Sequence, residues 1–232
     1  MNKEHTKKIC GEFPEFCYRA FNREEYAKQF LDNGSFRLGC RYNYRDIENK
    51  ARQDPTEGRG YTKEPGIVTT LWVSPNPTEK TIWTREQGYQ EYNIDLGNAV
   101  FLFCTSSPPV NLGHMRKNFG EYIVKIGEPQ KLAGDIYDYF VSTGHKFIIS
   151  GCKVVYNKGQ KLDGELEKNE RLDYSFKQKP ESFKPDCEFR IVAIKLEGQC
   201  KHECKYLDGE LLLECQYIEV KINKRLGYAH LI

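Results

Sequence analysis

The stretch Lys184–Ile194, KPDCEFRIVAI, constrains the fold of this chain more than any other. Its side chains after position 188 follow the period of two of a β-strand, and Pro185 disfavours a helix before it. Asp186 and Glu188 stand two residues apart, so we expect both carboxylates on one face of the strand. Like charges this close repel unless cations or a ligand offset them, and neutralising Glu188 is then expected to leave folding intact. The pair is either a solvated strand end or part of a site.

The length and charge of the chain limit its class. Its 232 residues suit one domain, spanning 1–232. Lysine plus arginine (35) nearly balance aspartate plus glutamate (33), so binding to a polyanion would need a local patch. The longest apolar run, 98–104, is too short to span a bilayer, and the first ten residues contain no apolar signal segment. These features predict a cytoplasmic protein without a membrane segment.

The nine cysteines are scattered and odd in number, which favours reduced thiols over a disulfide framework. Cys200, His202 and Cys204 have the spacing of metal ligands, and Cys187 or Cys215 could join them. A structural zinc site usually combines two ligand pairs, and the second pair is missing from the sequence. We therefore expect free thiols and no metal, although this cluster leaves a metal site open.

Hydrophobic periodicity predicts an α+β fold in which strands dominate. Strands are expected at 15–21, 36–39, 67–73, 80–84, 90–95, 99–105, 121–126, 147–156, 188–196 and 216–222. Helices are expected at 22–32, 42–51, 111–119 and 130–141. We expect Asn22 to cap the first helix and Gly34 to end it. Segment 54–66, rich in glycine and proline, is predicted to be an exposed loop, and 99–105 a strand buried on both faces.

Three polar pieces follow one another along the chain. They are Tyr18-Arg19, Thr105-Ser106-Ser107 and Asp186-Cys187-Glu188. Their order resembles the arginine–serine–glutamate branch of the ADP-ribosyltransferase fold, and YRA at 18–20 is similar to the opening of several bacterial toxin transferases. The resemblance implies a pair of mainly antiparallel sheets around an NAD cleft, with flanking helices.

A longer resemblance runs from about residue 16 to residue 196. It is carried by FRLG…YRDIENKARQDPTEG, FLFCTSS, FGEYIVKI and KPDCEFRIV. This thread resembles ADP-ribosyltransferase-like domains of bacterial anti-phage toxin–antitoxin systems, and also a broad uncharacterised bacterial family with CFS…MW and EKEYRI elements. The chain departs from the family pattern with Thr-Ser-Ser for Ser-Thr-Ser and with Asp186 for glutamate or glutamine. These departures leave the acceptor open.

The resemblance assigns roles to these residues. Glu188 would stabilise the oxocarbenium-like transition state that forms when the bond between nicotinamide and ribose breaks. Arg19 would hold NAD with its planar fork of donors, Ser106 would orient Arg19 or Glu188, and Asp186 would activate the acceptor. NAD, the ADP-ribose donor, is expected to contact Tyr18, Arg19, Thr105, Ser106 and Ser107. We expect Arg19, Ser106 and Glu188 to converge in the cleft, with helix 22–32 beside it.

The acceptor is expected to be RNA or protein. Arg45, Arg52 and Glu57 are candidate substrate-binding residues, in a row of arginines that could meet phosphates. The same residues equally suit a solvated helix with paired charges. A toxin of this kind would imply a neutralising antitoxin protein.

Other interpretations remain open at this point. Arg19 alone suits a structural salt bridge, and the hydroxyl run suits a turn. The chain could be a non-catalytic module of the same fold that binds a nucleotide or a partner protein. A metal-dependent nuclease using Asp186 and Glu188 is less favoured, because no lysine or histidine follows at the usual short spacing.

Overall fold

The computed structural model describes residues 9–40, 100–156, 177–196 and 217–232, together with the pairing of four further short strands. These strands are β4 (Lys63–Glu64) with β5 (Gln90–Glu91), and β10 (Lys205–Leu207) with β11 (Glu210–Leu212). The helix predicted at 42–51, the loop at 54–66 and the strands at 67–73 and 80–84 lie almost entirely outside the described residues. Within them, no helix is both long and apolar enough to span a membrane.

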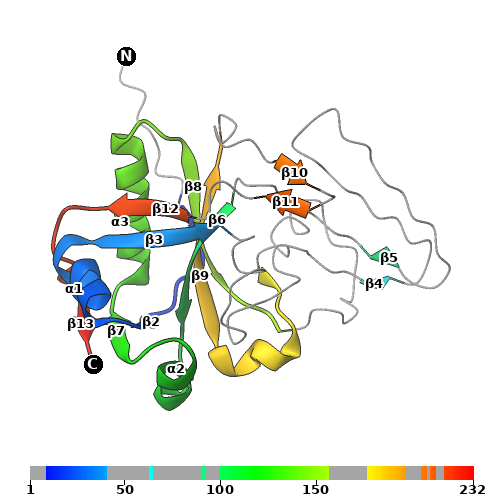
Figure 1. Ribbon diagram of the computed structural model, residues 1–232, viewed down its shortest axis with the longest axis horizontal. Coiled ribbons are helices and arrows are strands. Elements are labelled where there is room, and N and C mark those ends of the chain that lie inside the picture. The colour runs from blue at the N-terminus through cyan, green and yellow to red at the C-terminus, as the bar shows by residue number, and fades with distance from the viewer. Residues whose placement is uncertain are drawn as a thin grey trace.

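Nine strands form one mixed sheet, which agrees with the predicted α+β class (Figure 1). Its main path runs in the order β1 (Ile9–Gly11), β8 (Phe147–Lys153), β9 (Glu188–Lys195), β6 (Val100–Ser106), β2 (Cys17–Phe21), β7 (Tyr122–Ile126) and β13 (Ala229–Leu231). Off this path, β3 (Ser35–Cys40) pairs with β6 and with β12 (Tyr217–Lys221). The β1–β8 pair is parallel, and the other pairs are antiparallel.

The sheet forks at β6. One edge of β6 pairs with β9 along its whole length, as far as Ser106 opposite Glu188. The other edge is shared, because β3 pairs with Phe101 and Leu102 whereas β2 pairs with Ser106. Figure 1 shows β3 and β12 crossing β8 and β9 steeply. The described strands thus form two branches of one sheet where two separate sheets were expected.

Helices cover the branches. α1 (Glu24–Asn33) buries Ala27 and Phe30, and it ends at Gly34 in the left-handed conformation with φ 58°, as predicted. Its N-cap is Arg23 and makes no side-chain cap bond, so the expected Asn22 cap is wrong by one residue. The other helices of the described residues are α2 (Leu112–Asn118), α3 (Pro129–Ser142) and the short 3-10 helix η3 (Glu181–Asp186).

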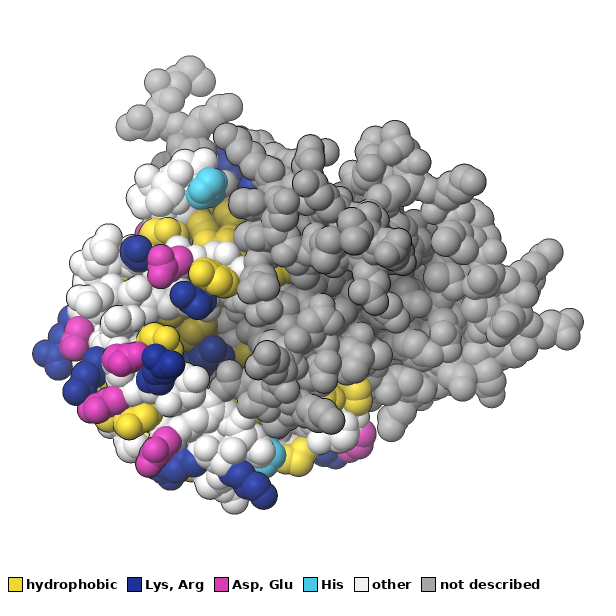
Figure 2. All heavy atoms as spheres, viewed as in Figure 1, with side chains coloured by type: hydrophobic (Ala, Val, Ile, Leu, Met, Phe, Trp, Pro, Cys, Tyr) yellow, Lys and Arg dark blue, Asp and Glu magenta, His cyan; other side chains and the backbone are white. Residues whose placement is uncertain are grey.

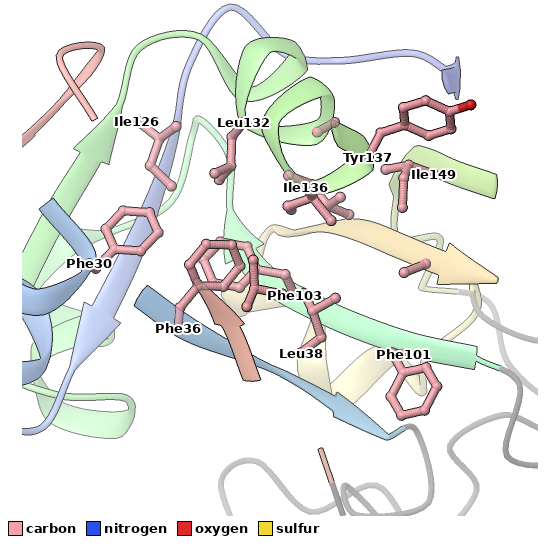
Figure 3. Close-up of a cluster of buried hydrophobic side chains, with 14 of the residues drawn as sticks. Phe30, Phe36, Leu38, Phe101, Phe103, Ile126, Leu132, Ile136, Tyr137 and Ile149 are labelled. Atoms are coloured by element: carbon pink, nitrogen blue, oxygen red, sulfur yellow. The ribbon is translucent and has the colours of Figure 1, made fainter. Parts of the chain in front are cut away.

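The main core fills the space between the two branches and α3. The rings of Phe30 and Phe36 lie 5.4 Å apart, and those of Phe36 and Phe103 lie 4.9 Å apart. Figure 3 shows Leu132 and Ile136 of α3 closing this cluster from the other side. All but one of the residues of β6 are buried, which confirms the prediction of a strand covered on both faces. The core therefore fixes the strand that carries the hydroxyl run.

Candidate functional site

A row of three side chains crosses the end of the central strands. Tyr18 of β2 is paired with Ser106 of β6, and Ser106 is paired with Glu188 of β9. Paired residues in a sheet project from the same face. The register therefore brings Tyr18, Ser106 and Glu188 to one face, although they are far apart in the sequence.

Glu188 is buried, with an exposed fraction of 5%, and is surrounded by donors. Its Oε1 accepts a hydrogen bond from Arg190 Nε at 2.7 Å, and its Oε2 lies 2.7 Å from Lys179 Nζ. Its backbone N–H donates to Tyr156 Oη at 2.6 Å. Burial opposes ionisation, but Arg190 and Lys179 together outweigh it and hold the pKa of Glu188 well below its ordinary value. Glu188 is therefore an ionised carboxylate inside the protein.

The two cations are themselves buried, Arg190 to 1% and Lys179 to 6% exposure. Lys179 Nζ also lies 4.6 Å from the centre of the Phe183 ring. These cations offset the carboxylate repulsion that the sequence suggested. Arg190 could have been found from the period of two, since it follows Glu188 on the same face. No sequence periodicity pointed to Lys179, because it reaches Glu188 from outside the strand.

Asp186 does not share a strand with Glu188, which corrects the sequence expectation. It ends η3, a 3-10 helix that contains Pro185. Proline has no N–H to donate, and Pro185 is tolerated because the backbone hydrogen bonds of this turn are donated by the N–H groups of Phe183 and Cys187. Cys187 then adopts a left-handed conformation with φ 45°, and β9 starts one residue later.

His114 of α2 contacts Asp186, and sequence reasoning missed it. Its Nε2 lies 2.8 Å from Asp186 Oδ1, and the Asp186 side chain is only 10% exposed. Burial raises the pKa of Asp186, and the His114 hydrogen bond and nearby Lys179 partly offset this. Among the described residues, no hydrogen bond reaches the second oxygen, Oδ2. Asp186 thus keeps one acceptor atom uncommitted.

The three hydroxyls of the polar run have different environments. Thr105 Oγ1 donates to the Phe189 carbonyl at 2.8 Å, and Ser107 Oγ donates to the Cys187 carbonyl at 3.3 Å. The Thr105 hydroxyl therefore ties β6 to β9, and the Ser107 hydroxyl ties the residue after β6 to the residue before β9. Ser106 Oγ makes no hydrogen bond within the described residues, and it lies on the Glu188 face. Of the three, Ser106 best suits a ligand.

Arg19 lies on the opposite face from Glu188, so the expected convergence of Arg19 with Ser106 and Glu188 is wrong. Arg19 follows Tyr18 along β2, and its guanidinium carbon lies 5.0 Å from the Phe103 ring centre, within the main core. Its Nη1 donates to the carbonyl of Cys104. That carbonyl lies between the part of β6 that pairs with β3 and the part that pairs with β2. Arg19 therefore bridges the fork of the sheet.

A hollow of about 430 Å³ opens beside Ser107. Its lining includes Phe13, Phe16, Lys153 and Phe189. Phe189 alternates with Glu188 along β9, so this hollow lies on the other face of the sheet from the Glu188 carboxylate. The described lining does not include Tyr18, Ser106 or Glu188, although the ring of the lining residue Phe16 lies 5.5 Å from the ring of Tyr18.

The remaining sequence candidates can be placed only in part. Arg45, Arg52 and Glu57 lie outside the described residues, as do Cys200, His202 and Cys204. No disulfide bond joins the described cysteines, and the described residues contain no group of three or more side chains suited to a metal ion. On the face in Figure 2, basic and acidic side chains of the described part are interspersed.

Comparisons with known proteins give no relative. No family model, no curated protein and no solved structure matches the chain.

Proposed function

We propose that the chain is an NAD-dependent mono-ADP-ribosyltransferase in which Glu188 stabilises the positive charge that develops on the ribose of NAD. The observation that carries the proposal is the Glu188 carboxylate, held by Arg190 and Lys179 at 2.7 Å each and directly opposite Ser106 on the same face. An oxocarbenium-like transition state needs a carboxylate that is already charged and fixed in place. Ser106 Oγ would hydrogen-bond the ribose or the carboxylate.

The role of Arg19 changes in this proposal. Its guanidinium bridges the fork, so it supports the strand that carries Ser106 and does not bind NAD. The cations at the site are Arg190 and Lys179, on the two oxygens of Glu188. A ribose hydroxyl that binds Glu188 would replace one of these contacts, and Lys179 reaches Oε2 from outside the strand.

The biological role follows the resemblance of the chain to anti-phage toxin domains. We propose a cytoplasmic toxin or defence effector that modifies RNA or protein and is neutralised by an antitoxin protein. The finer fold, two sheets around an NAD cleft, belongs to the same proposal. The two branches that meet at β6 are compatible with it.

Nicotinamide release from NAD tests the activity directly. Purified wild-type chain should release nicotinamide, and label from adenine-labelled NAD should appear on total bacterial RNA or on bacterial protein. Glu188→Gln should reduce nicotinamide release about 10²–10³-fold. Glu181→Gln is the matched control, because Glu181 is exposed and pairs only with Lys184 in the described part. A folded Glu188→Gln chain within a few-fold of wild type would contradict the proposal.

A non-catalytic module is the second candidate, and one observation favours it. Glu188 is only 5% exposed and both of its oxygens face protein cations, which is also the arrangement of a structural ion cluster. This candidate predicts that the wild-type chain releases no nicotinamide and that Glu188→Gln changes stability alone.

A further inference from the structure

We infer that His114 is a positioning residue that holds Asp186 as the base for an acceptor whose attacking group is a neutral O–H or N–H. This inference rests on the proposed function and extends it to the acceptor. It is carried by the contact between α2 and η3 and by the uncommitted oxygen of Asp186.

The tautomer of His114 follows from its neighbours. Asn118, one turn later on α2, places its side-chain Nδ2 at 3.1 Å from His114 Nδ1 and at 3.4 Å from Nε2, and the same amide donates to the His114 carbonyl at 3.1 Å. The Asp186 carboxylate decides the donor, because an ionised carboxylate only accepts hydrogen bonds and the facing Nε2 must therefore carry a proton. Nε2–H then donates to Asp186 Oδ1 across 2.8 Å. Asn111, the N-cap of α2, accepts from the backbone N–H of His114 at 3.1 Å and fixes the start of the helix.

This arrangement divides the work of the two Asp186 oxygens. Oδ1 accepts from His114, and Oδ2 has no hydrogen-bond partner among the described residues. In the transfer step, the acceptor O–H or N–H gives its proton to Oδ2 while its oxygen or nitrogen bonds to the ribose carbon C1′. The bond between C1′ and nicotinamide breaks, and nicotinamide leaves with the electron pair. Glu188 stays ionised throughout.

The charges around Asp186 suit a base. Lys179 precedes η3, Glu188 follows it on β9, Tyr156 follows β8, and His114 approaches from α2. Burial and Glu188 raise the pKa of Asp186, whereas His114 and Lys179 lower it. A raised carboxylate pKa makes a stronger base, as long as the group remains ionised at the working pH.

Substitutions at His114 test this positioning role. Gln places its amide N–H near the position of Nε2, whereas Asn is too short to reach Asp186 and Leu has no donor. The four chains to compare with wild type are His114→Gln, His114→Asn, His114→Leu and the control Lys117→Gln, on an exposed residue of the same helix. Two rates are measured between about pH 5 and 9. They are nicotinamide release in water and transfer from adenine-labelled NAD to the total bacterial RNA or protein that the wild type modifies.

We expect His114→Leu and His114→Asn to lose transfer about 10–100-fold, as for other residues that orient a reacting group, while nicotinamide release falls much less. His114→Gln should keep most of the transfer. The acidic limb of the transfer profile should move to higher pH in His114→Leu, because the lost hydrogen bond lets the pKa of Asp186 rise. Circular dichroism and thermal melting establish that each variant is folded.

Each outcome decides the inference. If the wild type releases nicotinamide, and His114→Leu shows the same transfer rate and pH profile as Lys117→Gln, the role of His114 is overturned while the proposed function stands. Loss of transfer in His114→Gln to the level of His114→Asn would also overturn it. A wild-type chain that releases no nicotinamide at any pH would instead overturn the proposed function, and this inference with it. If His114→Leu does not fold, the Gln and Asn pair decides.

Discussion

Arg190 Nε donates to Glu188 Oε1 across 2.7 Å, from two residues further along the same strand. Lys179 occupies the other carboxylate oxygen at the same distance. All three side chains are buried, so each charge depends on the others for the stabilisation that water would otherwise give. The cluster therefore couples the stability of the fold to the chemistry of the site.

Glu188→Gln should destabilise the protein, contrary to the expectation that removing the charge relieves repulsion. The substitution removes one charged member of a buried ion cluster, which typically costs about 3–5 kcal/mol. Urea unfolding measures the free energy of unfolding of each variant. The control is Glu181→Gln, which removes the anion of the exposed pair Glu181–Lys184. Equal free energies of unfolding for Glu188→Gln and wild type would show that the cluster relaxes at no cost.

The same cluster should make the free energy of unfolding fall as the pH is lowered into the acid range. The pKa of Glu188 is lower in the folded protein than in the unfolded chain, so the unfolded chain binds more protons in acid. The contribution of Glu188 is fully present above its unfolded pKa, about 4.3, and is lost as pH falls through the folded pKa. Asp186 acts in the opposite sense, because its folded pKa is raised. Burial, the largest cause, acts on Asp186 in both chains and cancels in their difference, whereas the smaller contribution of Glu188 to the pKa of Asp186 is lost in Glu188→Gln.

The measurement is the difference in unfolding free energy between wild type and Glu188→Gln as a function of pH. This difference should be constant near neutrality and should shrink on acidification below about pH 4.3. A difference that grows in acid would mean that the pKa of Glu188 is higher in the folded protein than in the unfolded chain, which would contradict its stabilisation as an anion by Arg190 and Lys179.

Arg19→Lys should reduce stability and leave NAD affinity unchanged. Lysine cannot lie flat against the Phe103 ring while it also donates to the Cys104 carbonyl at the fork. Loss of this partly buried hydrogen bond should cost about 1–3 kcal/mol, and amide exchange in β2 and β3 should become faster. Arg23→Lys is the control, because Arg23 is exposed and pairs with Glu25. Weaker NAD binding with unchanged stability would return Arg19 to the NAD site.

Local periodicity predicted most of the described strands and helices because it reports burial along one element. β6 and β9 follow their predicted ranges closely, and Gly34 ends α1 as expected for a left-handed C-cap. The fork could not be predicted, since it depends on which strand pairs with each part of the β6 edge. The edge strands β1 and β13 were missed because each has only three residues.

Sequence periodicity reaches only the part of this charged cluster that lies within a single strand. Glu188 was singled out from the sequence, and Arg190 could have been added because the period of two puts it on the same face. Arg19 was misplaced because neighbouring residues of a strand point to opposite faces. The sequence does not show whether Tyr18 or Arg19 shares the face of Ser106, and the pairing of Tyr18 with Ser106 shows that it is Tyr18. Lys179 and His114 reach the site from outside β9, so periodicity along β9 could not predict them. The helix η3 lies between Lys179 and β9, and it was not expected because Pro185 disfavours a helix.

The C-terminal segment 217–232 is held to α3 through Asp135. Asp135, buried on α3, accepts hydrogen bonds from Lys224 Nζ at 2.7 Å and from Tyr228 Oη at 2.8 Å. Tyr228 in turn accepts from the backbone N–H of Gly127 at 2.7 Å through its carbonyl. Burial and the adjacent Asp135 raise the pKa of Tyr228, so its hydroxyl remains a donor throughout the physiological range. These contacts tie the segment to α3 and to the end of β7.

Asp135→Ala should therefore loosen this segment more than it loosens the rest of the sheet. We expect a loss of about 1–3 kcal/mol, because Tyr228 loses its acceptor in a partly buried position. Hydrogen exchange followed by mass spectrometry should show faster exchange in residues 217–232 and little change in β6 and β9. Tyr228→Phe removes one of the two bonds and should have a smaller effect, and Gln130→Ala, at an exposed position on α3, should have none. Uniformly faster exchange across the sheet would mean that Asp135 supports the whole core and not this segment alone.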